Sequence, residues 1–452
     1  MTTFPNIHSL KKNAYKKTVN AFLPNTVLVP LRQDVNGSCR LLVKSGDRVN
    51  EGELIASGVL SENTNFSSMI YAPIPGIVSG VEPCICPDGK HSMAVRINLS
   101  GSFSYLGKKL QPLNTLSFSR NALLESIALK GIVNTFTTNE PTLLADDLKL
   151  SEKSNSGILV VRMFDEDSSR LTDTLLSSMY ACEIVKGTLI AAKAMNALGI
   201  VFVCGKDFSI PETENINVPF FEMVVDSKKY PSGYKNQLAR EILSRKKGEP
   251  FSAASGKSMF TDSSTMLELY RSVTFGKPTL SRYVLVSGEC LHASGLVNVP
   301  LGMSLRELAI QCGGLEKEPG AVIINGYVSG SAIYDLESPV TKYVKSVTFI
   351  PERKVPDQRT SVCVGCGSCR RICPEKLSPD LIYRHITDRK PVPKVYLDSA
   401  RFCTNCVLCN SCCPARLPLS QIIYNYNDFR LDRMKNKSSE KSETEPVEET
   451  LG

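Results

Sequence analysis

Eight cysteines near the C-terminus form two copies of one spacing, and their thiols could bind metal. The first copy is Cys363, Cys366, Cys369 and Cys373, followed by Pro374. The second copy is Cys403, Cys406, Cys409 and Cys413, followed by Pro414. Both copies read C-x2-C-x2-C-x3-C-P, the spacing that holds [4Fe–4S] clusters in bacterial two-cluster proteins. The chemistry that this spacing predicts is one-electron transfer.

The ligands of the two predicted clusters cross between the copies. Three cysteines two residues apart wrap a short loop around one cluster, whereas the fourth lies beyond its reach and serves the other cluster. The first set is therefore Cys363, Cys366, Cys369 and Cys413. The second set is Cys403, Cys406, Cys409 and Cys373. Crossing joins both clusters in one compact unit. Cys412 is an additional thiol, and Pro414 favours its neighbour Cys413 as the ligand.

Two other uses of these cysteines compete with the cluster interpretation. A structural zinc site takes four ligands in tetrahedral pairs, commonly two C-x2-C knuckles. Each run here offers three evenly spaced cysteines and a Cys-Pro instead. A disulfide framework needs an oxidising compartment, and the sequence shows no secretory signal. The spacing favours two clusters over zinc or disulfides.

Seven further cysteines are scattered along the chain, and we expect them to be reduced and structural. They are Cys39, Cys84, Cys86, Cys182, Cys204, Cys290 and Cys312. Cys84 and Cys86 form a C-x-C pair that could bind metal. A single pair without neighbouring ligands is weak evidence for a site.

The composition is that of an ordinary globular chain. Of its 452 residues, 42% are apolar and 22% are charged, with a net charge of +8, and this length predicts three or four domains. We interpret the basic runs Lys228–Lys229 and Arg245–Lys247 as solvated faces, because no nucleic-acid-binding motif accompanies them. They could still steer an acidic redox partner.

No stretch is predicted to span a bilayer. The most apolar stretch, Thr188–Gly205, contains Lys193 and Asn196 and breaks at Gly199. It falls short of the roughly 20 apolar residues that a spanning helix needs. We predict a helix that turns into the buried strand Ile200–Cys204. If the protein works at a membrane, partners hold it there.

The elements around these motifs predict a multidomain α+β chain that begins with a β domain. Residues 1–24 form a polar N-terminal segment, of which we expect residues 1–20 to be loosely ordered. Residues 25–104 show short strands separated by Gly and Pro turns in a twofold pattern. This pattern resembles the barrel-sandwich hybrid of biotinyl and lipoyl carriers. The hairpin between its halves, 57–69, has no lysine, so we predict a scaffold rather than a swinging arm.

Residues 105–276 change to an α/β pattern, and we predict a Rossmann-like domain there. Ile158–Val161 and Ile200–Cys204 are predicted to be buried strands. Leu171–Tyr180 and Gly187–Leu198 repeat apolar residues with the helical period and are predicted to be helices.

Residues 277–350 are predicted to form a small β-grasp domain of the SLBB-like kind. A strand begins at Tyr283, and Ser304 is the expected N-cap of a helix that ends at Gly313-Gly314. A further strand, Ala321–Asn325, follows. This succession of strand, helix, Gly-Gly and strand is typical of such a domain.

The C-terminal part holds the cysteine runs. Residues 351–430 are predicted to form a helical two-cluster ferredoxin domain. The runs continue alike, with Ile382-Tyr383 after the first and Ile423-Tyr424 after the second, which indicates an internal duplication. Residues 431–452 are a charged tail that we expect to be disordered.

These blocks, in this order, resemble the RnfC family, the C subunits of the Rnf ion-translocating electron transport complex. The resemblance rests on the barrel sandwich, the double cysteine run, SGECLHASGLVNVPLGMSLRELAIQCGG at 287–314 and YDLESPVTKYVKS at 334–346. The α/β and β-grasp blocks also resemble the flavin-binding subunit of respiratory complex I. The resemblance covers about residues 25–430. It implies a peripheral subunit on the cytoplasmic side of the bacterial inner membrane, with other membrane subunits of the complex as partners.

One segment departs from the family pattern. Relatives with a flavin site carry a loop of the form G-I-V-G-x-G-G-A-G-F-P-T, whereas this chain reads GIVNTFTTNEPT at 131–142. The inner glycines are replaced by Asn134, Phe136, Thr137 and Asn139. Backbone N–H groups of such loops approach phosphate closely, and any Cβ stands in the way. The family's acidic N-G-x-E-C-E-P segment is also replaced, near 162–167. We predict that FMN and NADH do not bind in the usual way, the alternative being a divergent loop that still binds flavin.

Three functions compete on this sequence. The first is an electron-transfer subunit that relays electrons from a low-potential donor, ferredoxin or flavodoxin, to membrane partners. The second is a soluble flavin-dependent reductase of the cobalamin-reductase type, and the third is an assembly scaffold with vestigial redox domains. No stand-alone catalytic residue is predicted. Arg370 and Arg371 either tune the first cluster, attract an acidic donor, or are simply solvated.

Overall fold

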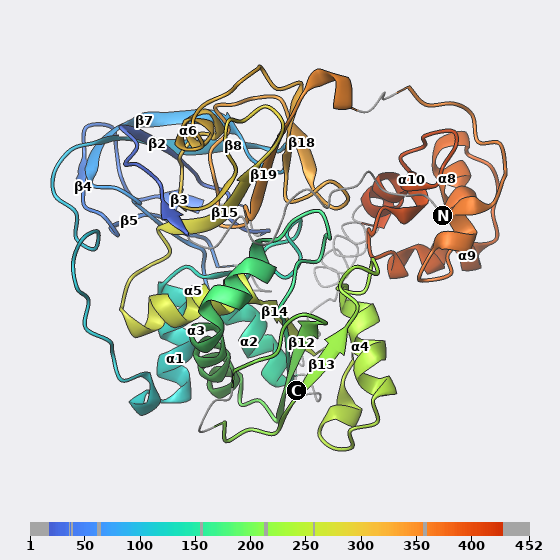
Figure 1. Cartoon of the computed structure of the whole chain (residues 1–452), viewed down its shortest axis with the longest axis horizontal. Helices are drawn as coiled ribbons and strands as arrows, with labels where there is room; N and C mark the ends of the chain where they lie inside the picture. Colours follow the sequence, from blue (N-terminus) through green and yellow to red (C-terminus); the bar gives the residue numbers. More distant parts are fainter. Residues whose placement is uncertain are drawn as a thin grey trace, which may run out of the picture. The chain divides into compact units, whose positions relative to one another are not determined.

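The computed structural model describes residues 18–427 except residues 36, 38, 61–64, 154–156, 212–215, 256–257 and 356–358. The chain divides into two compact units, residues 7–355 and residues 356–452 together with residues 1–6 (Figure 1). The expectations for residues 1–17 and for the tail 431–452 fall outside the described residues. The domain boundaries within the first unit remain predictions.

Two small antiparallel sheets form the N-terminal part of the first unit. Their strand orders are β2-β8-β7-β4 and β3-β5-β6. The strands are β2 (Thr26–Pro30), β3 (Cys39–Leu41), β4 (Arg48–Val49), β5 (Leu54–Gly58), β6 (Met69–Tyr71), β7 (Gly76–Ile85) and β8 (His91–Leu99). Val27, Val29 and Ile97 are among the alternating residues buried in one apolar cluster with Ile55 and Ile70 of the other sheet. The two sheets therefore form the predicted sandwich around one core.

The hairpin between β5 and β6 is attached to the α/β region. The backbone N–H groups of Asn65 and Phe66 donate to Oδ1 of Asp146 at 2.7 and 3.1 Å. The Lys149 ammonium lies 5.4 Å from the centroid of the Phe66 ring. These contacts hold the hairpin at Asn65 and Phe66.

Four parallel strands in the order β13-β12-β11-β14 form the central sheet of the α/β region. They are β11 (Ile158–Arg162), β12 (Gly199–Gly205), β13 (Phe220–Val225) and β14 (Met259–Asp262). The helices and short elements around it are η3 (Thr115–Ser117), α1 (Arg120–Leu129), β9 (Val133–Asn134), β10 (Thr142–Leu143), α2 (Leu144–Lys153), α3 (Thr172–Met195), α4 (Lys235–Ser244), η4 (Phe251–Ala253) and α5 (Ser263–Thr274).

Alternate residues of the central strands enter different cores, because successive side chains of a strand point to opposite faces. Leu159 and Val161 pack with α1, α2, α3 and α5 on one face. Ile158 and Val160 pack with α4 on the other face. Helices on both faces explain why β11 is buried at every position.

Helix α3 differs from the two helices that the sequence predicted. It is one element, Thr172–Met195, with a kink at Tyr180, whose φ/ψ of −128°/30° is not helical. The break after the first predicted helix is therefore present, although the chain resumes its helix at once. Asn196, in the left-handed conformation, ends α3.

By length and composition α3 could cross a membrane, contrary to the sequence expectation. It is the one such helix among the described residues, with a mean hydropathy of 1.3 over its most apolar window, of which 56% is buried. Ile184, Val185 and Ala191 lie in the core under the central sheet. This packing accounts for the apolar composition of α3 without a bilayer.

A six-stranded mixed sheet in the order β1-β16-β15-β19-β17-β18 completes the first unit. Its strands are β1 (Val19–Asn20), β15 (Ser281–Ser287), β16 (Gly295–Pro300), β17 (Ala321–Ile324), β18 (Ser331–Ile333) and β19 (Ser346–Ile350). Helix α6 (Leu305–Gln311) packs on it, and Ser304 and Glu307 form its capping box. The predicted succession of strand, helix, Gly-Gly and strand is thus present.

Part of the N-terminal segment is ordered, which corrects the expectation for residues 18–20. Val19 and Asn20 pair in parallel with Val297 and Asn298. The side-chain amides of Asn298 and Asn20 are hydrogen bonded at 3.2 Å. A short polar segment can add a strand at an open sheet edge because that edge offers unpaired backbone groups.

The second unit is helical. It contains α7 (Ser368–Ile372), α8 (Pro379–Asp388), α9 (Lys394–Ser399), η6 (Ala400–Phe402) and α10 (Leu408–Ser411), and residues 419–427 are also helical. The short turn η5 (Glu352–Lys354) precedes it along the chain. Ile382 of α8 and Ile423 pack together with Ala400, so the residues that repeat in the sequence share one core.

Candidate functional site

The two cysteine runs have matching backbones. Left-handed φ values occur at pairs of equivalent positions: Gly365 and Asn405 (70° and 51°), Gly367 and Val407 (68° and 62°), Lys376 and Arg416 (55° and 54°). A β-branched residue such as Val407 adopts this conformation only at an energetic cost, and such strain gathers at functional sites. The structure therefore supports the internal duplication and the special role of both loops.

The four cysteines of the second predicted set line one cavity. Its walls include Cys373 from the first run and Cys403, Cys406 and Cys409 from the second, and its volume is about 20 Å³. Leu377, Leu408 and Ile423 close it with apolar side chains. Cys373 is 30 residues from the nearest of the other three, so this meeting matches the crossing inferred from spacing.

The thiols of this cavity repel one another when ionised. Burial raises the pKa of Cys403 to about 11, and the neighbouring Cys406 and Cys373 contribute. Burial and the neighbours Cys403, Cys406 and Cys373 also raise the pKa of Cys409. Several thiolates in one enclosed space need a bound cation to be stable. This donor set therefore fits an iron–sulfur cluster.

Hydrogen-bond donors are directed at the sulfurs. The Leu377 N–H donates to Cys373 Sγ at 3.4 Å. Hydrogen bonds from the Leu408 backbone and the Thr404 side chain act to lower the pKa of Cys406, against the larger effect of burial, which leaves it raised. N–H···S bonds of this kind stabilise thiolate charge and tune cluster potentials.

The first predicted set is more open. Cys369 is buried and packs with Cys363, Cys412 and Cys413, whereas Cys366 is exposed. Negative charge on Cys412 helps to raise the pKa of Cys369, and negative charge on Cys366 helps to raise the pKa of Cys412. The Cys412 thiol also donates to the Cys409 carbonyl at 3.4 Å. Both Cys412 and Cys413 therefore lie in this group.

Among the described residues, no three Cys, His, Asp or Glu side chains stand where they could hold a single metal ion. A [4Fe–4S] cluster binds each thiolate through a different iron, so its ligands need not converge on one point. The 16 cysteines are all free thiols, and the seven scattered ones include the buried Cys204 and Cys290.

Three arginines surround the first run, of which the sequence had singled out two. Arg370 forms a double ion pair with Asp380, at 2.6 Å for both contacts. Arg371 donates to the Cys366 carbonyl at 3.3 Å and to Ser368 at 3.0 Å. Arg384, which the sequence did not reveal, donates to Cys363 Sγ at 3.3 Å. It was missed because α8 returns it to the run from 21 residues away.

The loop that replaces the glycine-rich flavin loop is filled by its own side chains. Phe136 is 5% exposed, and its ring centroid lies 5.4 Å from that of Phe260. Thr135 is fully buried and donates to Asp262 at 3.0 Å. Asn134 donates to Asp147 and to the Phe260 carbonyl. Side chains thus occupy the space into which a glycine loop would admit a ligand.

A cavity of about 390 Å³ remains beside this loop, but its charges do not suit a phosphate. Glu140 and Asp147 line it together with Lys235. Burial raises the pKa of Asp147 and lowers that of Lys235. Two carboxyl groups against one ammonium disfavour an anionic ligand.

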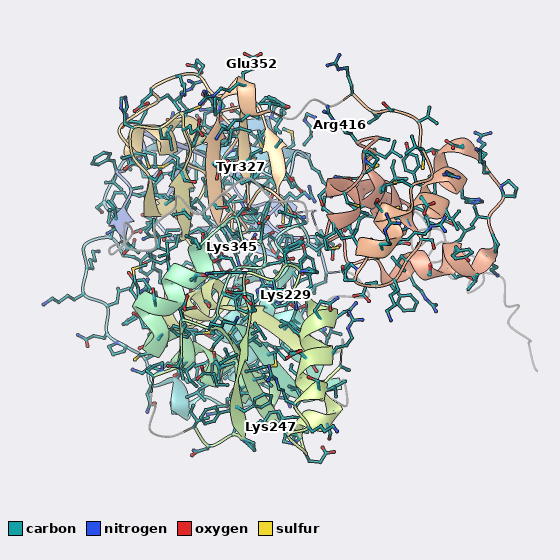
Figure 2. The ribbon with its side chains drawn as sticks, turned by 45° about the vertical axis from the view of Figure 1, so that its right-hand side comes forward. Lys229, Lys247, Tyr327, Lys345, Glu352 and Arg416 are labelled. Carbon is teal, nitrogen blue, oxygen red and sulfur yellow. The ribbon has the colours of Figure 1, made fainter. Side chains whose placement is uncertain are left out.

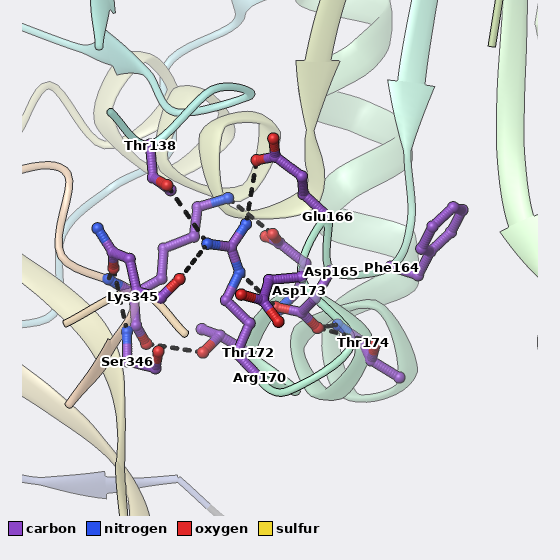
Figure 3. Close-up of polar contacts among 12 residues, drawn as sticks. Thr138, Phe164, Asp165, Glu166, Arg170, Thr172, Asp173, Thr174, Lys345 and Ser346 are labelled. Atoms are coloured by element: carbon purple, nitrogen blue, oxygen red, sulfur yellow. Dashed lines mark hydrogen bonds and ion pairs between the residues drawn. The ribbon is translucent and has the colours of Figure 1, made fainter. Parts of the chain in front are cut away.

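The segment 162–167, which stands where relatives are acidic, is part of a buried charge network (Figure 3). Arg170 is 1% exposed and lies 3.5 Å from both Asp165 and Glu166. It also donates to the Asn325 carbonyl at 3.0 Å. Asp167 accepts hydrogen bonds from the backbone of Val328 and Ser329. These side chains join the α/β region to the six-stranded sheet.

Lys345 is the centre of this network. Its ammonium lies 2.7 Å from both Asp173 and Asp262, and all three side chains are fully buried. Figure 3 shows Lys345 beside Asp173. Although burial raises the pKa of Asp262, Lys345 holds it below its ordinary value. No period or motif in the sequence singles out Lys345, because its partners come from α3 and β14. The basic runs at Lys229 and Lys247, by contrast, are exposed as expected (Figure 2).

Comparison with known proteins agrees with the family resemblance. Residues 6–102 match the RnfC barrel sandwich hybrid domain. The chain is 26% identical over 366 residues to the C subunit of the ion-translocating oxidoreductase complex of Rhodobacter capsulatus, across 79% of this chain and 69% of that protein. The chain is therefore similar to RnfC subunits over most of its length. The predicted barrel sandwich is confirmed with it.

A second RnfC relative gives a similar result. The C subunit of the Na(+)-translocating ferredoxin:NAD(+) oxidoreductase complex of Acetobacterium woodii is 24% identical over 369 residues, across 79% of this chain and 80% of that protein. Among solved structures, an NAD+-reducing [NiFe]-hydrogenase shares 13% identity at a TM-score of 0.43, across 69% of this chain and 54% of that chain. That likeness is too distant to carry an argument.

Proposed function

We propose that this chain is the electron-transfer subunit of a membrane-bound, ion-translocating oxidoreductase. In this role it relays electrons from a low-potential soluble donor, ferredoxin or flavodoxin, through two [4Fe–4S] clusters to membrane partners. The RnfC relatives support the type of complex. The observation that carries the redox role is the cavity that Cys373 shares with Cys403, Cys406 and Cys409.

The roles of the residues follow from this arrangement. Cys403, Cys406, Cys409 and Cys373 would hold one cluster, and Cys363, Cys366, Cys369 and Cys413 the other. When bound, such clusters each take up and release one electron at a time. The short helices α7 and α10 begin just before the third cysteine of each run and orient it. Leu377 N–H and Arg384 stabilise charge on Cys373 and Cys363.

This subunit works without flavin in our proposal. Phe136 and Thr135 fill the loop, Arg162 donates to the Phe136 carbonyl at 2.8 Å, and Glu140 and Asp147 line the adjacent cavity. The same observations disfavour the second candidate, a flavin-dependent reductase of the cobalamin-reductase type. That candidate requires the cofactor, and nothing in the filled loop admits its phosphate.

We place the chain on the cytoplasmic side of the membrane as a peripheral subunit. The relatives are subunits of complexes, and α3 is packed into the α/β core. Contacts with the other membrane subunits would then hold it in place. Electron carriage, rather than a bond-making reaction of its own, is the activity that we assign to it.

Anaerobic purification with iron, sulfide and flavin quantification tests the proposal. About eight irons and no flavin per chain are expected for two [4Fe–4S] clusters. Bound zinc or stoichiometric flavin would contradict it. The scaffold alternative is tested separately by Cys366→Ala, which leaves electron flux unchanged only if the clusters are vestigial.

A further inference from the structure

The two cysteine runs differ in exposure although their backbones match. Cys366 is exposed, whereas the equivalent Cys406 is only 9% exposed. Val362 and Val364, on either side of Cys363, are 84% and 71% exposed. In the second run the position of Val364 holds the polar Thr404. A partner that covers both valines would remove their apolar surface from water.

Two arginines, Arg371 and Arg384, contact the same loop around Cys363 and Cys366. Arg384 contacts Cys363 Sγ, and Arg371 contacts the Cys366 carbonyl at 3.3 Å. Among the described residues, neither guanidinium forms an ion pair with a carboxylate, in contrast to Arg370. Arg384 interacts with the Cys363 sulfur and, at longer range, with Asp380, whereas the Arg371 guanidinium bonds only uncharged oxygens among the described residues.

The second run lacks these charges. Arg371 corresponds to Ser411, 40 residues later, because the runs themselves are 40 residues apart. Arg384 follows Ile382-Tyr383, and its counterpart after Ile423-Tyr424 is Asn425. The second copy carries its own arginines, Arg401 and Arg416, but none at the positions of Arg371 and Arg384. This difference indicates a role of these two arginines that is specific to the first copy.

The described part of the second unit, residues 359–427, is basic. Residues 359–427 contain ten Lys and Arg against four Asp and Glu, which is most of the excess charge of the chain. An oppositely charged partner is attracted by such a surface and associates faster at low salt. An apolar centre with a charged rim is the usual composition of a protein–protein interface.

We propose that Val362, Val364, Arg371 and Arg384 form a docking surface for an acidic electron-transfer protein. The partner is expected to present carboxylates around a small apolar patch. Electrons from the partner would enter at the cluster of the first cysteine run and then pass to the cluster of the more buried second run. Each reduced donor molecule gives up one electron as one cluster in the chain accepts it. This inference rests on the proposed function, since it needs clusters bound at these cysteines.

Rapid mixing tests the surface with a defined probe. A reduced, acidic bacterial two-cluster ferredoxin is mixed anaerobically with the full-length holoprotein, and its oxidation is followed over a range of salt. Arg371→Glu is expected to lower the second-order rate constant about tenfold at low salt, with the difference fading near about 0.5 M salt, where exposed charges are screened. Val364→Asp is expected to weaken ferredoxin binding about tenfold, measured by calorimetry.

Arg401→Glu is the matched control, because it makes the same charge change beside the second run. Its rate constant should stay within about twofold of the unmodified protein. Iron content and the electron paramagnetic resonance spectrum of each variant show whether its clusters are intact. Absence of clusters from the unmodified protein would overturn the proposed function itself. With clusters intact, equal rates for Arg371→Glu and Arg401→Glu, or no ferredoxin binding at all, would overturn the docking surface alone.

Discussion

The guanidinium of Arg162 lies 4.1 Å from the centroid of the Phe136 ring, and it also donates to the Phe136 carbonyl at 2.8 Å. These residues belong to the two segments that depart from the flavin-binding pattern of the family. The two segments therefore pack against each other through Arg162 and Phe136. Changing the Phe136 loop alone would leave the buried Arg162 guanidinium without these contacts.

Phe136→Ala is predicted to destabilise the first unit without creating a flavin site. Removing a buried ring from a packed core costs about 3–5 kcal/mol, and here the Arg162 stacking is lost as well. Urea denaturation followed by circular dichroism measures the change. Phe22→Ala, at a 72% exposed phenylalanine, should stay within about 0.5 kcal/mol. Similar losses for both variants would show that the Phe136 packing is not stabilising.

Lys345→Met is predicted to be among the most damaging single changes in the first unit. It removes the ammonium that lies 2.7 Å from the buried carboxylates of Asp173 and Asp262, which costs about 3–5 kcal/mol. Adding Asp262→Asn should recover part of this loss, because one uncompensated charge is removed. The four denaturation curves of this double-mutant cycle measure the coupling. Additive effects would mean that the contacts between Lys345 and these carboxylates carry no net interaction.

The sequence predicted which four cysteines line the cavity of Cys373, but it did not predict the tertiary network. The spacing alone predicted that Cys373 lies near Cys403, because the reach of a short loop limits which sulfurs can share a cluster. Periodicity located β11 and β12 within a residue or two, since they are buried on both faces. The network of Lys345 and Arg170 could not be predicted, because its partners meet only after the sheets have packed. The β1 strand was missed since two residues in a polar segment carry no strand signal.

Lys342 is predicted to make stability depend on pH. Its ammonium donates to the Met69 and Gly131 carbonyls at 2.7 and 2.8 Å, and burial lowers its pKa to about 8. Between about pH 8 and the unfolded lysine value of about 10.4, the unfolded chain binds more protons. The unfolding free energy should therefore rise with pH in this window, by about 3 kcal/mol relative to Lys342→Met.

The check on this prediction is a pH series of denaturation curves for both proteins. Lys90→Met, at an exposed lysine, is the control and should follow the unmodified protein. A constant difference between the unmodified protein and Lys342→Met from about pH 7 to about pH 10 would refute the prediction.

Replacing single cysteines is predicted to remove clusters in the crossed pattern. Cys373→Ser should deplete the cluster of the second run and leave that of the first, because Cys373 lies with Cys403, Cys406 and Cys409. Cys413→Ser should have the reverse effect, and Cys412→Ser should retain both clusters. Iron content and the magnetic spectra of the reduced variants separate these cases. If Cys412→Ser loses a cluster and Cys413→Ser does not, the ligand assignment in the first set moves to Cys412.

The central claim is that two groups of four thiolates each hold an iron–sulfur cluster. Its most direct test is low-temperature electron paramagnetic resonance of the anaerobically prepared, dithionite-reduced protein, together with its metal content. We expect about eight irons per chain and the signals of two interacting reduced [4Fe–4S] clusters. A silent spectrum, or zinc in place of iron, would contradict the account.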